Sequence, residues 1–214
     1  MTTSTLWPGR NFRPRSATSA PRGFTLVEVM IAASLGSVIL LATLSTFLFL
    51  GRSGANIQNY IDMETQARKA LELFAEDSRQ ASAITWNSST DVTLVVDGKY
   101  VRYYYAATAP SGSTQKANFF YRIPPSASAP SIPASPPSNT LLISGVTAFV
   151  YKAYNINGTE ITDFSSAAAL TAASKATKQL QISLESSRAS TTVVAATNSV
   201  LSARFILRNK RVTT

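Results

Sequence analysis

Residues 22–50 read RGFTLVEVMIAASLGSVILLATLSTFLFL, and this stretch decides the fold. Residues 24–50 contain a single charged side chain, Glu28. A helix needs about 20 apolar residues to span a bilayer, so this segment is long enough to cross one with some tilt. A secretory signal cleaved near residues 53–55 is the alternative, but the apolar part of such a signal usually has only about 7–15 residues. We therefore expect a transmembrane helix over residues 24–50.

The segment before the apolar run is basic and contains several prolines. Residues 1–23 hold four of the 20 lysines and arginines and none of the 11 acids. They have little apolar surface to bury, so we expect a disordered leader. Arg52 is the nearest cation after the run, and the positive-inside rule then places the N-terminus in the cytoplasm and everything after residue 50 outside.

The sequence after the apolar run keeps a helical period but becomes amphipathic. No proline occurs in residues 22–109. Apolar residues recur at helical spacing and predict a single stripe that covers a sheet. The stripe consists of Ile57, Tyr60, Ile61, Ala67, Ala70, Leu71, Phe74 and Ala81. We predict one nearly continuous helix over about residues 24–82, with residues 51–84 as its amphipathic half. Two helices, broken by the glycines in residues 51–54, are the alternative.

Residues 85–214 have the two-residue period of strands and are expected to form one β-rich globular domain. Asp97-Gly98 lies between two strand-like runs, which predicts a hairpin with a type I′ turn. Further strands are predicted at residues 118–123, at 141–154 as one strand or two, at 179–185 and at 199–207. Residues 124–138 hold six prolines and predict a surface loop. Residues 165–177 are either a short helix or a loop.

These elements together predict the α+β class, with a long N-terminal helix packed on an antiparallel β-sheet. The sheet region is large enough for one hydrophobic core. The consecutive Tyr103, Tyr104 and Tyr105 cannot all lie on one face of a strand, because successive side chains point to opposite faces. We therefore expect at least one of these rings to be exposed or to lie at a contact between subunits.

Composition excludes many catalytic sites. The 214 residues include no cysteine and no histidine. The chain therefore has no disulfide, no thiolate or imidazole zinc site, no cysteine nucleophile and no Ser-His-Asp triad. We expect no enzyme activity, no cofactor, no metal and no small-molecule substrate. A periplasmic enzyme anchored by an uncleaved signal is the alternative from another functional class.

The run Arg22-Gly23-Phe24-Thr25-Leu26-Val27-Glu28 before a long apolar helix resembles the class III signal of type IV prepilins and of the pseudopilins of type II secretion. The resemblance implies a pilin-like fold. It also implies that a prepilin peptidase cuts between Gly23 and Phe24 and methylates the new N-terminal Phe24. The implied location is the bacterial inner membrane, crossed once with the N-terminus in the cytoplasm, and afterwards the periplasm or a cell-surface filament.

The same resemblance implies partners and a specific role. The partners are other pilin or pseudopilin subunits, the peptidase and the inner-membrane assembly platform. Two shorter motifs, at residues 77–81 and 205–209, resemble PilW-like minor pilins and J-type minor pseudopilins. A minor type IV pilin that enters or initiates a filament is the predicted function. A minor pseudopilin of a type II secretion system is the alternative.

Two charged features need an interpretation. A charge inside a bilayer is costly unless it is paired. In the context of the signal, Glu28 is predicted to meet the Phe24 amine of a neighbouring subunit and to set the register of assembly. The alternative is that Glu28 only reaches back to the membrane interface. The second feature is a basic C-terminus, for which we favour a solvated tail, so contact with nucleic acid is unsupported. It consists of Arg204, Arg208, Lys210 and Arg211.

Overall fold

The structure is a computed structural model that describes residues 23–109, 114–137, 140–190 and 193–212. The predicted leader therefore lies outside the described residues, except for Gly23. The chain divides into two compact units, Met1–Leu48 and Phe49–Thr214.

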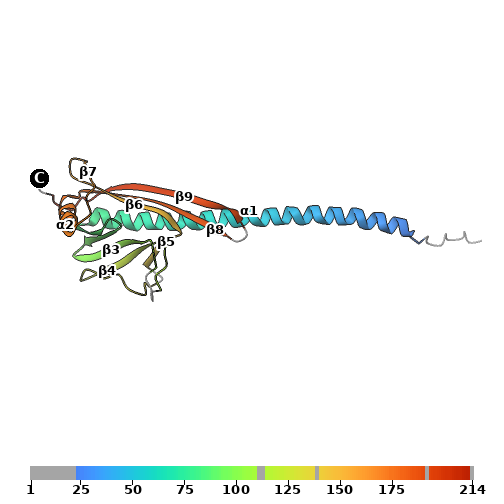
Figure 1. The fold of residues 1–214 in the computed structure, drawn as a ribbon, viewed down its shortest axis with the longest axis horizontal. Helices are drawn as coiled ribbons and strands as arrows, with labels where there is room; N and C mark the ends of the chain where they lie inside the picture. The colour runs from blue at the N-terminus through green and yellow to red at the C-terminus, as the bar shows by residue number, and fades with distance from the viewer. Residues whose placement is uncertain (1–22, 110–113, 138–139, 191–192, 213–214) are drawn as a thin grey trace, which may run out of the picture. The chain divides into compact units, whose positions relative to one another are not determined.

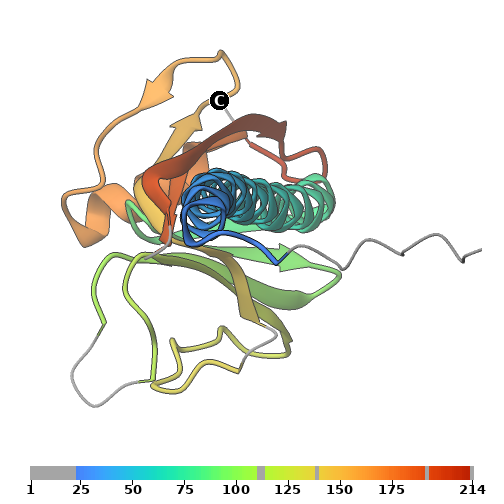
Figure 2. The same cartoon turned by 90° about the vertical axis from the view of Figure 1, so that its right-hand side faces the viewer.

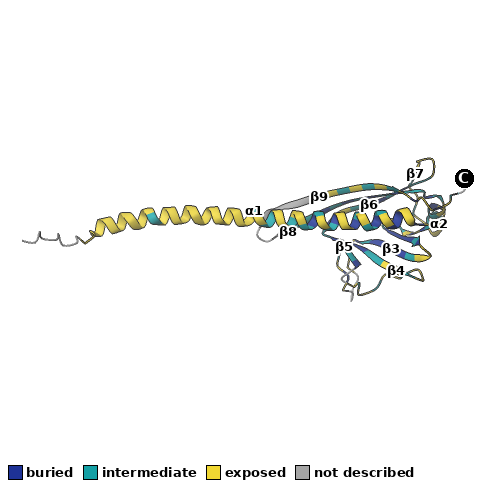
Figure 3. Ribbon diagram, turned by 180° about the vertical axis from the view of Figure 1, so that it is seen from behind, coloured by how far each residue is buried: buried dark blue, intermediate teal, exposed yellow. Residues whose placement is uncertain are grey.

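One helix, α1 (Leu26–Gln80), accounts for the first part of the chain. The predicted continuous helix is confirmed, and the alternative of a break at residues 51–54 is wrong. In the first unit every described residue except Gly36 is exposed. The most apolar part of α1 is long and apolar enough to cross a membrane, and none of that part is buried. Figure 3 shows exposed residues along this part of α1 and recurring buried residues along its last part.

The described residues of the second unit form two antiparallel sheets rather than the predicted single sheet. One sheet has the order β1-β2-β3-β4-β5, and the other has the order β7-β6-β8-β9. The strands of the first sheet are β1 (Ala83–Ser88), β2 (Asp91–Val96), β3 (Lys99–Ala106), β4 (Phe119–Ser126) and β5 (Leu141–Ser144). Those of the second are β6 (Val146–Tyr154), β7 (Glu160–Ile161), β8 (Gln179–Ser190) and β9 (Val193–Ile206). The α+β class is confirmed.

Within this unit, α1 lies between the two sheets (Figures 1 and 2). Its buried residues are Met63, Ala67, Ala70, Phe74, Asp77 and Ser78. The predicted stripe is therefore correct from Ala67 onward. It is wrong at Ile57, Tyr60 and Ile61, whose side chains are 58%, 50% and 49% exposed. A periodic pattern identifies the apolar face of a helix, but it does not say how far along that face the sheets extend.

The chain passes from one sheet to the other at a single residue. Gly145 separates β5 from β6, so of the two alternatives for residues 141–154, one strand or two, the structure has two. Its φ angle is +69°, and a Cβ there would lie 2.6 Å from the carbonyl oxygen of Ser187. A positive φ and so close a backbone approach both require glycine.

Local turn chemistry explains the β2–β3 hairpin. Asp97 and Gly98 have φ angles of 48° and 72°, and Val96 pairs with Lys99. This confirms the predicted type I′ turn. The helix alternative for residues 165–177 is also confirmed, because α2 (Ala167–Ala176) forms there, with the Ser166 hydroxyl accepting a hydrogen bond from the Ala169 amide.

Two strands were missed, and one predicted boundary is wrong. The short strands β1 and β7 were not predicted. β4 continues through Pro124 and Pro125 to Ser126, so the proline-rich loop begins later than expected. β4 pairs with β5 only up to Tyr121. Beyond that residue, the backbone on this edge of β4 has no neighbouring strand to which an N–H group must donate. Prolines are therefore tolerated there.

The expectation that one of the three tyrosine rings is exposed is also wrong, whereas a contact between subunits stays a prediction. Tyr103 and Tyr105 face the main core, with Tyr103 fully buried and Tyr105 half-buried. Tyr104 faces the opposite side of β3 but is only 2% exposed, in a small second cluster with Ala106 and Tyr121. Tyr104 stacks on Tyr121 with a centroid distance of 5.1 Å. Neighbouring side chains of β3, β4 and β5 thus bury Tyr104 on the outer face of this sheet.

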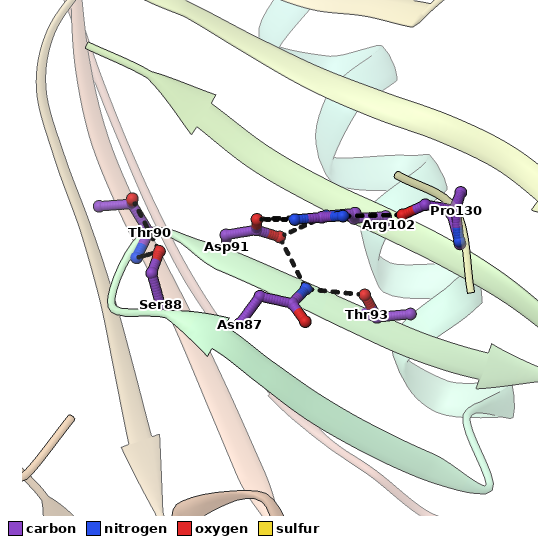
Figure 4. A network of polar contacts seen from close by, with 7 residues as sticks. All are labelled: Asn87, Ser88, Thr90, Asp91, Thr93, Arg102 and Pro130. Carbon is purple, nitrogen blue, oxygen red and sulfur yellow. Dashed lines mark hydrogen bonds and ion pairs between the residues drawn. The ribbon is translucent and has the colours of Figure 1, made fainter. Parts of the chain in front are cut away.

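A polar network ties the proline-rich loop to the outer face of this sheet (Figure 4). The Arg102 guanidinium donates from Nε to both carboxylate oxygens of Asp91, at 2.9 and 3.1 Å. Its Nη1 donates to the carbonyl of Pro130 at 2.7 Å, which fixes the proline-rich loop to β3. The Asn87 side-chain amide donates to Asp91 and to the Thr93 hydroxyl.

Candidate functional site

The predicted cleavage bond joins two exposed residues directly before α1. Gly23 has no neighbouring heavy atom within 4 Å of the position that a Cβ would take. The Phe24 side chain is 87% exposed. The backbone at both residues is non-helical, and α1 begins at Leu26. A peptide bond in this setting is open to a peptidase, because no hydrogen bond of the helix has to be broken first.

Glu28 lies in the first turn of α1 and closes a capping box with Thr25. The Glu28 Oε2 atom accepts hydrogen bonds from the Thr25 amide at 2.9 Å and from the Thr25 hydroxyl at 3.0 Å. In return the Thr25 Oγ1 atom accepts from the Glu28 amide at 3.2 Å. These reciprocal bonds satisfy two donors that a helix start otherwise leaves without partners.

The capping box was not part of the sequence prediction. Its signature, a threonine followed three residues later by a glutamate before an apolar run, stands at Thr25 and Glu28 and was available in the sequence. The box uses one carboxylate oxygen of Glu28. Among the described residues, no hydrogen bond is formed to its other oxygen, Oε1. One oxygen is thus committed to the helix start and one is left for another donor.

The helix that follows is apolar on all sides. Large apolar side chains of the first unit are more than half exposed, including Leu26, Ile31, Leu41 and Phe47. A helix of this kind is stable only where lipid or other apolar helices surround it. Its few polar side chains do not interrupt the helix, because their hydroxyls donate to backbone carbonyls of the preceding turn. These side chains are Ser34, Ser37, Thr43 and Thr46.

A buried ionic network fixes the amphipathic part of α1 to the first sheet. The Asp77 Oδ2 atom accepts from the Arg122 Nε at 2.9 Å and from the Tyr103 hydroxyl at 2.5 Å. The side chains of Arg122 and Asp77 are only 18% and 9% exposed. Burial, and then the Asp77 charge, raises the pKa of Tyr103 far above its usual value. Tyr103 therefore stays protonated and keeps donating to Asp77.

The structure brings together the two short motifs at the end of α1 and the end of the chain. The side-chain amide of Asn209 donates to the carbonyl of Gln80, the last residue of α1, at 3.2 Å. Carbonyls at a helix C-terminus lack partners within the helix. Asn209 satisfies one of them and so ties the C-terminal segment to the helix.

The interpretation of the basic C-terminus as a solvated tail is wrong for Arg204, which lies in β9, and for Lys210, which is buried, whereas Arg208 and Arg211 are exposed. The Arg204 guanidinium stacks on the Tyr154 ring at 3.5 Å from its centroid. Lys210 is 6% exposed, and its ammonium donates to the carbonyls of Ser174, Lys175 and Thr177 at 2.5–2.8 Å. The side chain thus caps the C-terminus of α2, where a cation is favoured by the helix dipole. The four cations do not form one free patch for nucleic acid.

Comparison with known proteins agrees with the N-terminal site. Residues 19–44 match the family model of the prokaryotic N-terminal methylation motif. This range contains Gly23, Phe24 and Glu28 together with the first part of α1. A search of the curated proteins found no match. The chain therefore carries a prokaryotic N-terminal methylation motif, which supports a type IV pilin or pseudopilin family, and its α+β fold of a long apolar helix and antiparallel sheets is consistent with a pilin-like fold.

Proposed function

We propose that the chain is a minor type IV pilin, made as a prepilin and then incorporated into a filament or used to initiate one. The observation that carries the proposal is the methylation motif at residues 19–44, placed where the exposed Gly23–Phe24 bond opens a spanning helix. In this proposal the leader lies in the cytoplasm, and the second unit lies in the periplasm or on the cell surface. The protein acts as a structural subunit rather than as an enzyme.

Assembly in this proposal depends on Phe24 and Glu28. Cleavage after Gly23 creates a positive amine on Phe24, four residues before Glu28. The Oε1 atom of Glu28 takes no hydrogen bond from any described residue and suits the Phe24 amine of a neighbouring subunit. A charge-assisted bond of this kind is stronger than a neutral one, especially among apolar helices that exclude water. It would fix the axial position of each subunit.

N-terminal processing is the direct test. Intact-mass measurement and N-terminal sequencing of the membrane-derived protein should show a chain that begins at methylated Phe24. The same form should be found in filaments sheared from the cell surface. A chain that begins at Met1 contradicts processing, and one that begins near residue 56 indicates an ordinary secretory signal. The proposal is then wrong.

A minor pseudopilin of a type II secretion system is the second candidate function, because its signal and fold are of the same kind. The two functions differ in where the processed protein is found. A pilin is recovered in sheared surface filaments, and its deletion reduces their number. A pseudopilin stays in the cell envelope, and its deletion blocks secretion of exported proteins while surface filaments are unchanged.

A further inference from the structure

The proline-rich segment of the second unit plays no part in the N-terminal signal, and its composition is unusual. Residues 124–138 consist of six prolines, five serines, three alanines and one isoleucine. Residues 123–151 contain no charged side chain. Segments rich in serine or threonine together with proline are typical sites of O-linked glycosylation, because they have no core to form and leave their hydroxyls in solvent.

One edge of this segment lies against the protein and the rest is exposed. Proline fixes φ at about −65° and also favours an extended conformation in the residue before it. Half-buried positions recur every third residue, at Pro130, Pro133 and Pro136, whereas the residues between them are exposed. Three residues is the period of the polyproline II conformation. The prolines therefore form the inner edge of the segment, and the serines between them lie on its outer side.

Hydrogen bonds to the backbone hold the segment at three points. The carbonyls of Pro130, Ala134 and Pro137 each accept a bond from elsewhere in the unit, at 2.7, 3.1 and 3.0 Å. The donors are, in that order, the Arg102 guanidinium, the Thr114 amide and the Thr140 amide. These anchors use only main-chain groups of the segment, so they position its serine side chains without occupying them.

Three serines of the segment have exposed side chains, Ser128, Ser131 and Ser135. Their hydroxyls form no hydrogen bond with any residue that the structure describes. The exposed Ser165 is different, because its hydroxyl donates to Asp163 at 2.7 Å. A hydroxyl on an exposed, anchored backbone can enter the active site of a transferase without first breaking an interaction within the protein.

We propose that Ser128, Ser131 and Ser135 are sites of O-linked glycosylation. The serine Oγ attacks C1 of a sugar carried on a diphosphate, the bond from C1 to the diphosphate oxygen breaks, and the hydroxyl proton passes to a base of the transferase. Phosphorylation fits less well, because a phosphate adds about two negative charges that need a cation. The Arg102 guanidinium beside the segment already pairs with Asp91. The inference holds whether or not the chain enters a filament.

The test uses the full chain purified from the membranes of the cells that naturally make it. Trypsin should release the whole segment in one peptide, residues 123–152, because no lysine or arginine lies between Arg122 and Lys152. Mass spectrometry should find this peptide heavier than its sequence by a whole number of sugar residues. Mild base, which eliminates O-linked sugars, should remove the added mass. The N-terminal peptide of the same digest reports separately whether the chain begins at Phe24.

A variant that combines Ser128→Ala, Ser131→Ala and Ser135→Ala should lose the added mass, while the prolines and the backbone anchors remain. The matched control is Ser165→Ala, which removes an exposed hydroxyl elsewhere and should leave the added mass unchanged. An unmodified peptide from the natural protein, or added mass that persists in the triple variant, would overturn the proposal. An added phosphate instead of a sugar would assign the serines to a kinase and would also overturn it.

Discussion

The carboxylate of Glu28 has two roles with different chemical demands. Capping the helix needs a hydrogen-bond acceptor at this position, and glutamine supplies one as well as glutamate does. Pairing with a neighbouring Phe24 amine needs a negative charge. The two roles therefore separate when Glu28 is replaced by glutamine in one variant and by valine in another.

Glu28→Gln and Glu28→Val should both remain in the membrane and be cut after Gly23, because the scissile bond is untouched. Both should be depleted from sheared filaments by orders of magnitude, since losing one partner of a buried ion pair costs about 3–5 kcal/mol. Quantitative immunoblotting of membrane and filament fractions measures this. If only the valine variant is depleted, the cap rather than the charge is required for assembly.

Asp77 allows a second test at the scale of one residue. Asp77→Ala leaves the Arg122 guanidinium buried without its partner, which should lower the free energy of unfolding by about 3–5 kcal/mol. Glu64→Ala is the control, because Glu64 pairs with Arg68 on the exposed face of the same helix. That change should cost less than about 1 kcal/mol. Thermal unfolding of the full chain in detergent compares the two, and equal effects would show that the Asp77 network does not stabilise the fold.

At this scale the sequence singles out residues with unusual local chemistry, but it does not predict burial that depends on the packing of other strands. The Gly23–Phe24 pair and Glu28 stand out because a single acid in an apolar run is unusual. Tyr104 is different, because its burial depends on Tyr121 and on other side chains of β4 and β5, which only the folded sheet brings beside it. No local pattern around Tyr104 contains that information.

Elements formed by local interactions were predicted well. The Asp97-Gly98 turn fixes its hairpin within a few residues, and the absence of proline in residues 22–109 agrees with one long helix. The division into two sheets was not predicted. It depends on a change of direction at Gly145, whose φ angle and contact with Ser187 appear only when β8 is in place. β7 is two residues long and gives no periodic signal at all.

Gly145→Ala tests the sheet junction directly. The added methyl group would lie 2.6 Å from a backbone oxygen at a positive φ, so the variant should lose at least about 2 kcal/mol of stability. Gly54→Ala is the matched control, because Gly54 lies in α1 with no neighbour within 4 Å of the added carbon. Alanine should stabilise the helix there by up to about 1 kcal/mol. Thermal melting should therefore shift in opposite directions, and a neutral Gly145→Ala would mean that the junction is not constrained.

The second unit, taken as a whole, has the core that an independent domain needs. Phe74 of α1 is fully buried against Tyr103, Tyr151 and Phe205 from both sheets. The amphipathic part of α1 is therefore part of the core of this unit. The sheets cannot be expected to fold without it.

A chain of residues 53–214 should be soluble, monomeric and rich in β-structure, as judged by size-exclusion chromatography and circular dichroism. A chain of residues 85–214 lacks the helix and exposes the apolar faces of both sheets, so it should aggregate. An aggregated product from the longer chain would contradict the domain boundary. A well-folded product from the shorter chain would show that α1 is dispensable for the core.

In the proposed assembly, the exposed apolar surface of the first unit would also determine how subunits find one another. Each buried CH₂ group is worth roughly 0.8 kcal/mol, and the side chains of residues 24–50 consist almost entirely of apolar carbons. The concentration of a free subunit dissolved in water is then negligible. Encounters between anchored subunits would then be confined to diffusion in the plane of the membrane, where the helices share one orientation and depth. A search in two dimensions among aligned molecules replaces a search in three, and even a low-abundance subunit can then meet its partners at a high effective concentration.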